Sequence, residues 1–129
     1  MSEQLKRDIL ELMQRLLDSI ARADWESYQL LCDPTLSCFE PECRGCLVQG
    51  MEFHAFYFDL GGATGPHNTT MCSPHVRLIG DAAVVSYVRL VQRVDDAGKP
   101  VTVPSEETRI WQRQGAAWRH VHFHRSMNG

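Results

Sequence analysis

The first 22 residues carry a hydrophobic pattern with the period of an α-helix. Apolar side chains recur every three or four positions, and charged residues lie between them: Leu5, Ile9, Leu12, Met13, Leu16, Leu17 and Ile20. This spacing predicts an amphipathic helix over about residues 3–22, whose single apolar stripe must pack against another element.

Shorter elements are expected between residues 24 and 60. Asp24 is placed to cap a helix over WESYQLLC, which the Asp33-Pro34 pair should end, and TLSCFEP then predicts a short strand. MEFHAFYFDL predicts a third helix, and the glycines and proline of GGATGPHN predict a loop after it. We expect the third helix to place four large side chains on one side: Phe53, Phe56, Tyr57 and Leu60.

From about residue 69 the pattern changes to that of β-strands. Strands are expected near 69–79, 82–94, 101–113 and 117–126, separated by Gly80-Asp81, DDAG and Gln114-Gly115. Helices followed by a meander of long antiparallel strands predict one α+β domain over residues 1–129, in which the long helix packs on a curved sheet.

The strand over 82–94 is apolar on both faces. One set of alternate residues is Ala83, Val85, Tyr87, Arg89 and Val91, and the other contains Val84, Ser86, Val88, Leu90 and Val94. An antiparallel sheet with one solvated face should alternate apolar and polar residues. One face can meet the helices of the domain, so we expect self-association to cover the second; cover by the domain's own loops is the alternative.

Composition excludes some classes of function. The chain has 129 residues, a formal net charge of −3 and a pI near 6.0, so it has no basic surface for nucleic acid. Its apolar stretches are far shorter than the roughly 20 residues that cross a bilayer, so no membrane partner is expected. The N-terminal MSEQLKRDIL lacks the apolar core of a secretory signal, which predicts a cytoplasmic protein.

Five cysteines include a pair, Cys43 and Cys46, with the CxxC spacing of redox and zinc sites. The flanking segments FEPE and LVQG do not form the strand–helix context of a redox motif. Zinc would need two further ligands, and no second pair lies at a suitable spacing. We therefore predict free thiols, no metal and no cofactor.

Each of the last three strands carries an arginine among its apolar residues. Arg89 alternates with Val85 and Tyr87, Arg109 with Glu107 and Trp111, and Arg125 with Val121 and Phe123. If consecutive strands pair, these guanidinium groups converge on the concave face, where each keeps its proton and needs an anion. Three arginines against Glu107 would leave excess positive charge, suited to a small carboxylate or phosphate.

Two alternatives stay open for these arginines. They can lie at the rim of the sheet, or be paired by Glu52, Asp59 and Glu107. A β-bulge in any of the strands would also shift the alternation by one residue.

Histidines form a second cluster on the last strand. His120, His122 and His124 alternate and are expected on the face opposite Arg125. Alternate residues of a strand lie about 6.5–7 Å apart, so one ion reaches two of them at most. We predict an interface or hydrogen-bond role for the three, and a place in a cavity wall for His54.

Several segments together resemble the association, or hub, domain of calcium/calmodulin-dependent protein kinase II. They are DWESYQLLCDP, FEPE, GMEFHAFYF, SPHVRLIGDAA, YVRL, PSEETRIWQR and WRHVHFHRS, spread from about Leu5 to Ser126. The resemblance implies a nuclear transport factor 2-like cone fold and a non-catalytic homo-oligomerisation module, typically of twelve or fourteen subunits in two stacked rings. It also implies a pocket for a small carboxylate or peptide at Arg89, Arg109 and Arg125, with His54, Tyr57 and Glu107 beside them.

The sequence also departs from that family. No G-x-G-x-x-G loop, HRD or DFG motif of a kinase domain is present. The MSEQ start favours a free-standing hub-like protein. We expect such a protein to assemble with its own copies, or with kinase subunits that carry a related hub. The loop after Phe58 is shorter and lacks an aromatic residue, and Cys43 and Cys46 replace unreactive residues.

An alternative function is that of a dimeric cone-fold enzyme such as an isomerase or dehydratase. Glu107, His54 and Tyr57 would then supply the acid and base. A carboxylate held by arginines has a lowered pKa and is a poor base at neutral pH, which favours binding over catalysis.

Overall fold

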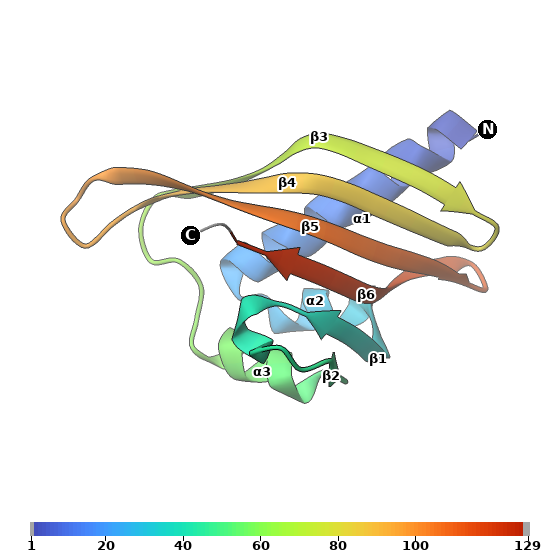
Figure 1. The fold of residues 1–129 in the computed structure, drawn as a ribbon, viewed down its shortest axis with the longest axis horizontal. Helices are drawn as coiled ribbons and strands as arrows, with labels where there is room; N and C mark the ends of the chain where they lie inside the picture. The colour runs from blue at the N-terminus through green and yellow to red at the C-terminus, as the bar shows by residue number, and fades with distance from the viewer. Residues whose placement is uncertain (1, 128–129) are drawn as a thin grey trace.

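The structure, a computed structural model, describes residues 2–127 and joins three α-helices to a six-stranded sheet (Figure 1). The helices are α1 (Ser2–Arg22), α2 (Trp25–Leu31) and α3 (Glu52–Asp59), with a 3₁₀ turn, η1 (Pro41–Cys43), before α3. The strands are β1 (Cys32–Phe39), β2 (Val48–Gln49), β3 (His67–Ile79), β4 (Ala82–Val94), β5 (Pro100–Gln114) and β6 (Ala117–Ser126). They lie in the order β2-β1-β6-β5-β4-β3, so the predicted α+β architecture is confirmed.

Helix α1 crosses one face of the sheet, behind the strands in Figure 1, and its apolar stripe forms the centre of the core. Ile9, Met13, Leu16 and Leu17 are fully buried, as the sequence pattern predicts. Trp111 of β5 is also fully buried, and its Nε1 donates to the sulfur of Met13 at 3.1 Å, which links helix and sheet. None of the helices within residues 2–127 is long and apolar enough to span a bilayer.

The late strands pair as the predicted antiparallel meander. The β4–β5 register is unbroken from Ala82 opposite Gln112 to Val94 opposite Pro100. Alternate residues therefore keep to one face along both strands, and Ala83, Val85 and Tyr87 are buried on the helix side. In β3 the register shifts between Cys72 and His75, where a bulge is formed.

The second helix ends earlier, and the first strand begins earlier, than the sequence predicted. Helix α2 stops at Leu31, and β1 already includes the Asp33-Pro34 pair that was expected to end the helix. Strand β1 runs parallel to β6, and its register shifts between Cys32 and Ser37. Proline has no N–H to donate, and Pro34 falls in that unpaired stretch, so it does not break the strand.

Helix α3 has the predicted aromatic side, on which the Tyr57 ring contacts those of Phe53 and Phe56, but this side is largely exposed. Phe56 and Leu60 are 62% and 70% exposed, whereas His54 is buried. Phe58 packs its ring 4.7 Å from that of Tyr28 in α2. The helix thus meets the core through positions 54 and 58, one turn apart, and presents Phe56 and Leu60 to solvent.

Candidate functional site

The inner face of the sheet and helices α2 and α3 enclose a cavity of about 310 Å³. Five of the six predicted pocket residues line it, namely Arg89, Arg109, Arg125, His54 and Tyr57. Glu107 lies behind the arginines and does not line the cavity. The structure therefore brings the predicted set together in space; that this cavity binds a ligand stays a prediction.

Glu107 is the centre of a buried hydrogen-bond network. Its Oε1 accepts from the Tyr87 hydroxyl at 2.6 Å and from Arg109 Nη2 at 2.9 Å. Its Oε2 accepts from the Ser105 hydroxyl at 2.9 Å and lies 2.8 Å from Arg89 Nε. The Glu107 side chain has no exposed area, and Arg109 is 1% exposed. Two guanidinium groups thus share one buried carboxylate.

The charge on Glu107 follows from these partners. Burial raises the pKa of a carboxyl, but Arg109 and Arg89, with the Tyr87 hydrogen bond, outweigh it and lower the pKa of Glu107 to about 2. The carboxylate is therefore ionised and a weak base at neutral pH. This environment does not suit the acid–base role that an enzyme would give it.

Arg125 is paired by two carboxylates that directly follow β1. Its Nη2 donates to Glu40 Oε1 at 3.2 Å and to Glu42 Oε2 at 2.7 Å.

The sequence alternative named Glu52 and Asp59 as additional partners of the arginines, and these are wrong. The predicted excess of positive charge is also absent among the described residues, because three carboxylates, Glu40, Glu42 and Glu107, face the three arginines.

Arg89 differs from the other two arginines in its bonding. Its side chain is 11% exposed, and it lines the cavity. Although Nε lies close to Glu107, the contact is not aligned as a hydrogen bond, and within residues 2–127 this nitrogen has no hydrogen-bond acceptor. Arg89 is therefore the guanidinium whose donors are least satisfied by the protein itself.

His54 forms part of the cavity wall, as predicted for this residue. Its Nε2 lies 3.7 Å from Cys38 Sγ, and its Nδ1 lies 3.7 Å from Glu40 Oε2. Burial, with a smaller effect of the Arg109 charge, lowers the pKa of His54 to about 4. The ring is thus neutral at physiological pH. Tyr57 is 40% exposed and lies at the mouth of the cavity.

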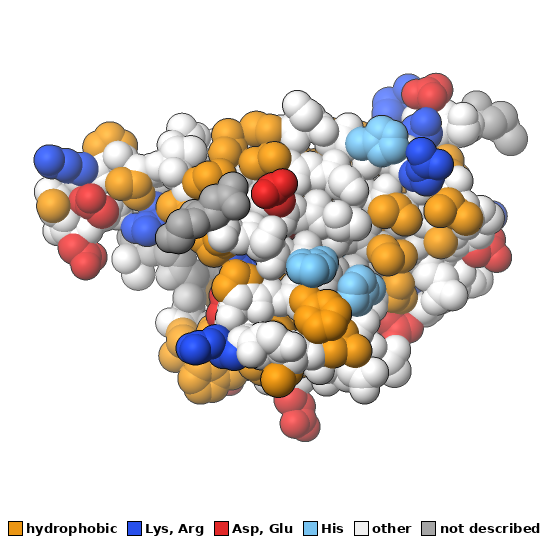
Figure 2. All heavy atoms as spheres, viewed as in Figure 1, with side chains coloured by type: hydrophobic (Ala, Val, Ile, Leu, Met, Phe, Trp, Pro, Cys, Tyr) orange, Lys and Arg blue, Asp and Glu red, His pale blue; other side chains and the backbone are white. Residues whose placement is uncertain are grey.

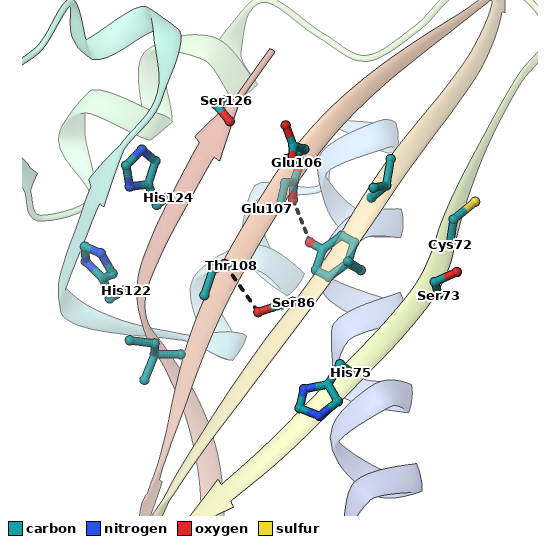
Figure 3. Close-up of a pocket in the computed structure, with 13 residues that line it drawn as sticks. Cys72, Ser73, His75, Ser86, Glu106, Glu107, Thr108, His122, His124 and Ser126 are labelled. Atoms are coloured by element: carbon teal, nitrogen blue, oxygen red, sulfur yellow. Dashed lines mark hydrogen bonds between the residues drawn. The ribbon is translucent and has the colours of Figure 1, made fainter. Parts of the chain in front are cut away.

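The prediction that three histidines share one face is wrong for His120. The β5–β6 register shifts between Ile110, opposite His122, and Trp111, opposite His120. This bulge turns His120 to the inner face, where it is fully buried and stacks at 5.5 Å on Phe123. His122 and His124 stay on the outer face, where Figure 3 shows them beside each other.

The outer face of the sheet carries a broad, open depression of about 790 Å³ (Figures 2 and 3). Strands β3 to β6 all contribute to it. Its lining mixes apolar and small polar side chains with histidines and a carboxylate, and it includes Ser86, Val88, Glu106, Thr108, Ile110, His122 and His124. Figure 2 shows that the centre of this face is open to solvent. The second apolar face of β4 is thus present and is not covered by the loops within residues 2–127.

The long helix, the curved sheet and the cavity between them define a nuclear transport factor 2-like cone fold. The chain is similar to an NTF2-like superfamily protein from Salmonella enterica serovar Typhimurium, with a TM-score of 0.80 and 26% identity over 100% of this chain and 94% of that one. The sequence model of the calcium/calmodulin dependent protein kinase II association domain matches residues 5–129. The chain belongs to this family.

Individual relatives agree with that assignment. The association domain of C. elegans CaMKII is similar with a TM-score of 0.92 and 46% identity over 97% of both chains. The delta subunit of calcium/calmodulin-dependent protein kinase type II from Oryctolagus cuniculus is 47% identical over 124 residues. That match covers 94% of this chain but 23% of the relative. These 129 residues are thus association domain and contain no kinase catalytic domain, which fits an oligomerisation module.

Proposed function

We propose that this chain assembles with copies of itself into a two-ring hub of twelve or more subunits. The observation that carries the proposal is the open outer face of the sheet. The inner side of β4 is covered by α1, while Val84, Val88 and Leu90 on its outer side are only partly buried in one copy. Apolar strand faces of this kind are stable when a second surface covers them. Kinase subunits with a related hub are the further partners that we propose.

Native mass spectrometry tests the assembly. We expect wild-type protein at low micromolar concentration to have the mass of a dozen or more 14.7 kDa chains. Ile110→Asp should reduce this to small species, because a buried, unpaired carboxylate in the interface is costly. Gln112→Asp is the matched control at an exposed position on the same strand and should leave the mass unchanged. A monomeric or dimeric wild-type protein would contradict the proposal.

We further propose that the inner cavity binds a small carboxylate, free or at the end of a peptide. Two features support this. Arg89 lines the cavity, and within residues 2–127 its carboxylate partner is Glu107, which it shares with Arg109. Glu42, which pairs Arg125, is 37% exposed, so a ligand carboxylate can displace it at low cost. A bidentate pair between Arg125 and the ligand would then replace an internal ion pair of similar geometry.

Arg125→Ala tests this cavity. Millimolar butyrate or succinate should raise the melting temperature of the wild-type protein by a few degrees, and this shift should disappear in the variant while the native mass stays the same. Arg113→Ala, at a half-exposed arginine outside the cavity, is the control and should keep the full shift. An unchanged shift in Arg125→Ala would show that the ligand binds elsewhere.

A further inference from the structure

Behind the His54 side of the cavity lies a cluster of four side chains whose atoms are typical metal ligands. Cys38 Sγ is at its centre, 3.8 Å from Cys43 Sγ, 3.7 Å from His54 Nε2 and 3.9 Å from Glu40 Oε2. Cys38, Cys43 and His54 are buried, and Glu40 is nearly so. The cluster joins the end of β1, η1 and the first turn of α3.

The three separations from the Cys38 sulfur are close to those between the ligands of one tetrahedral metal ion. Zinc lies about 2.3 Å from sulfur and about 2.0 Å from nitrogen or oxygen, which puts neighbouring ligand atoms roughly 3.3–3.8 Å apart. Ligand atoms of Cys38, Glu40 and His54 all lie within 4.8 Å of one another, and the Cys43 sulfur adjoins that group through Cys38. Cys38, Glu40 and His54 thus already lie within reach of one ion, and the Cys43 side chain must move toward His54 and Glu40 to become the fourth ligand.

We propose that Cys38, Cys43, His54 and Glu40 form a structural site for zinc or a similar thiophilic divalent cation. Two thiolates with one imidazole and one carboxylate are a donor set that suits zinc. The sequence prediction of no metal depended on the absence of a second CxxC pair. The structure instead couples Cys43 with Cys38, whereas Cys46, its partner in the CxxC motif, is exposed.

The charges around the cluster allow a divalent cation to replace the protons of the two thiols. Burial raises the pKa of the Cys38 thiol, so without a metal the thiol keeps its proton. A divalent cation that replaces the two thiol protons leaves the net charge of the cluster unchanged, and repulsion by nearby Arg109 does not increase. Glu40 can serve both neighbours, because Arg125 contacts its Oε1 and the cluster contacts its Oε2. The metal would thereby fix the carboxylate that positions Arg125.

Cobalt substitution tests the site on the whole chain under anaerobic, reducing conditions. Titration with CoCl₂ should give a near-ultraviolet thiolate-to-cobalt charge-transfer band and visible bands of tetrahedral cobalt, which saturate at one ion per chain. Zinc should abolish both sets of bands. Cys38→Ser and Cys43→Ser should each weaken cobalt binding by more than about tenfold, since even the loss of a residue that only hydrogen-bonds a metal ligand costs that much. Cys46→Ser is the matched control and should bind cobalt as the wild type does.

Three results would overturn the site. They are a wild-type protein without the charge-transfer band, a band that Cys46→Ser abolishes, and a Cys38–Cys43 disulfide in peptide mapping of protein that binds no metal. Circular dichroism and native mass check that each variant is folded. If Cys38→Ser fails to fold, the Cys46→Ser/Cys72→Ser double variant decides the question, because it removes the more exposed thiols and keeps the buried cluster. Loss of the band in that variant would refute the proposal.

Discussion

Replacing Glu107 by glutamine is expected to lower the free energy of unfolding by about 3–5 kcal/mol. The substitution keeps the size of the side chain and an acceptor for Tyr87, but it removes the only carboxylate that Arg89 and Arg109 contact within residues 2–127. Both guanidinium groups would then be buried without a counterion. Denaturant unfolding followed by circular dichroism at pH 7 and fixed protein concentration measures the loss.

The control for this experiment is the next residue along β5. Glu106 is exposed and points to the outer face, so Glu106→Gln should change the free energy of unfolding by no more than about 0.5 kcal/mol. Equal losses in the two variants would mean that the charge of Glu107 is not what stabilises the fold.

The pH dependence provides an independent measurement of the same interaction. The pKa of Glu107 is lowered from 4.5 to about 2 in the folded protein, so its stabilisation is complete above pH 4.5 and is lost as the pH falls towards 2. His54, whose pKa falls from 6.5 to about 4, adds a loss of stability between those values. That second loss is common to wild type and Glu107→Gln. The two curves should therefore converge only below pH 4.5, and parallel curves there would contradict the assignment.

The sheet half of the cavity could be predicted from the sequence, because one geometric rule is sufficient for it. Side chains alternate along a strand, and the β4–β5 register has no bulge. Arg89 and Tyr87 therefore face the same side as Glu107 and Arg109, with Tyr87 directly opposite Glu107. The rule fails only where the register shifts, and His120 lies at such a shift.

The other half of the cavity could not be predicted, since it depends on a pairing between distant segments. Strand β1 lies parallel to β6 and pairs residues about 85 positions apart, such as Cys38 with Phe123. Nothing local in FEPE indicates that Glu40 and Glu42 reach Arg125. Pro41, between the two glutamates, could have indicated a turn at this point, because it follows the end of β1 and starts η1. That turn directs both carboxylates toward the cavity.

These two halves have different consequences for the charge balance. The sheet contributes two arginines to one carboxylate, and the segment after β1 contributes two carboxylates to one arginine. The total is neutral in the absence of a ligand. A carboxylate ligand must therefore displace Glu42 toward solvent, so we infer that binding and the position of the β1–α3 segment are coupled. A metal ion bound by Cys38 and Glu40 would hold Glu40 in place, so that a ligand would displace Glu42 alone.

A triple variant, Arg89→Met/Glu107→Gln/Arg109→Met, should recover at least about 2 kcal/mol of the stability that Glu107→Gln alone loses. Methionine fills the space of the arginine stems without a charge. The glutamine oxygen still accepts from the Tyr87 hydroxyl, and its NH2 group can donate to the Ser105 hydroxyl, whose oxygen also accepts. Replacing a whole buried ionic network by apolar groups often costs little stability. Removing only one partner is strongly destabilising, because the charge that remains is buried without a counterion.

The same variant separates stability from binding. It should keep the native mass of the wild type, because the substituted side chains are buried on the helix side of the sheet, and it should show no thermal shift with butyrate. Arg113→Met, at an exposed arginine of β5, is the control and should keep both properties. If the triple variant is as unstable as Glu107→Gln, the stability that Glu107→Gln loses does not come from guanidinium groups buried without a counterion. If it keeps the butyrate shift, Arg89 and Arg109 are not needed for carboxylate binding, and Arg125 holds the ligand without them.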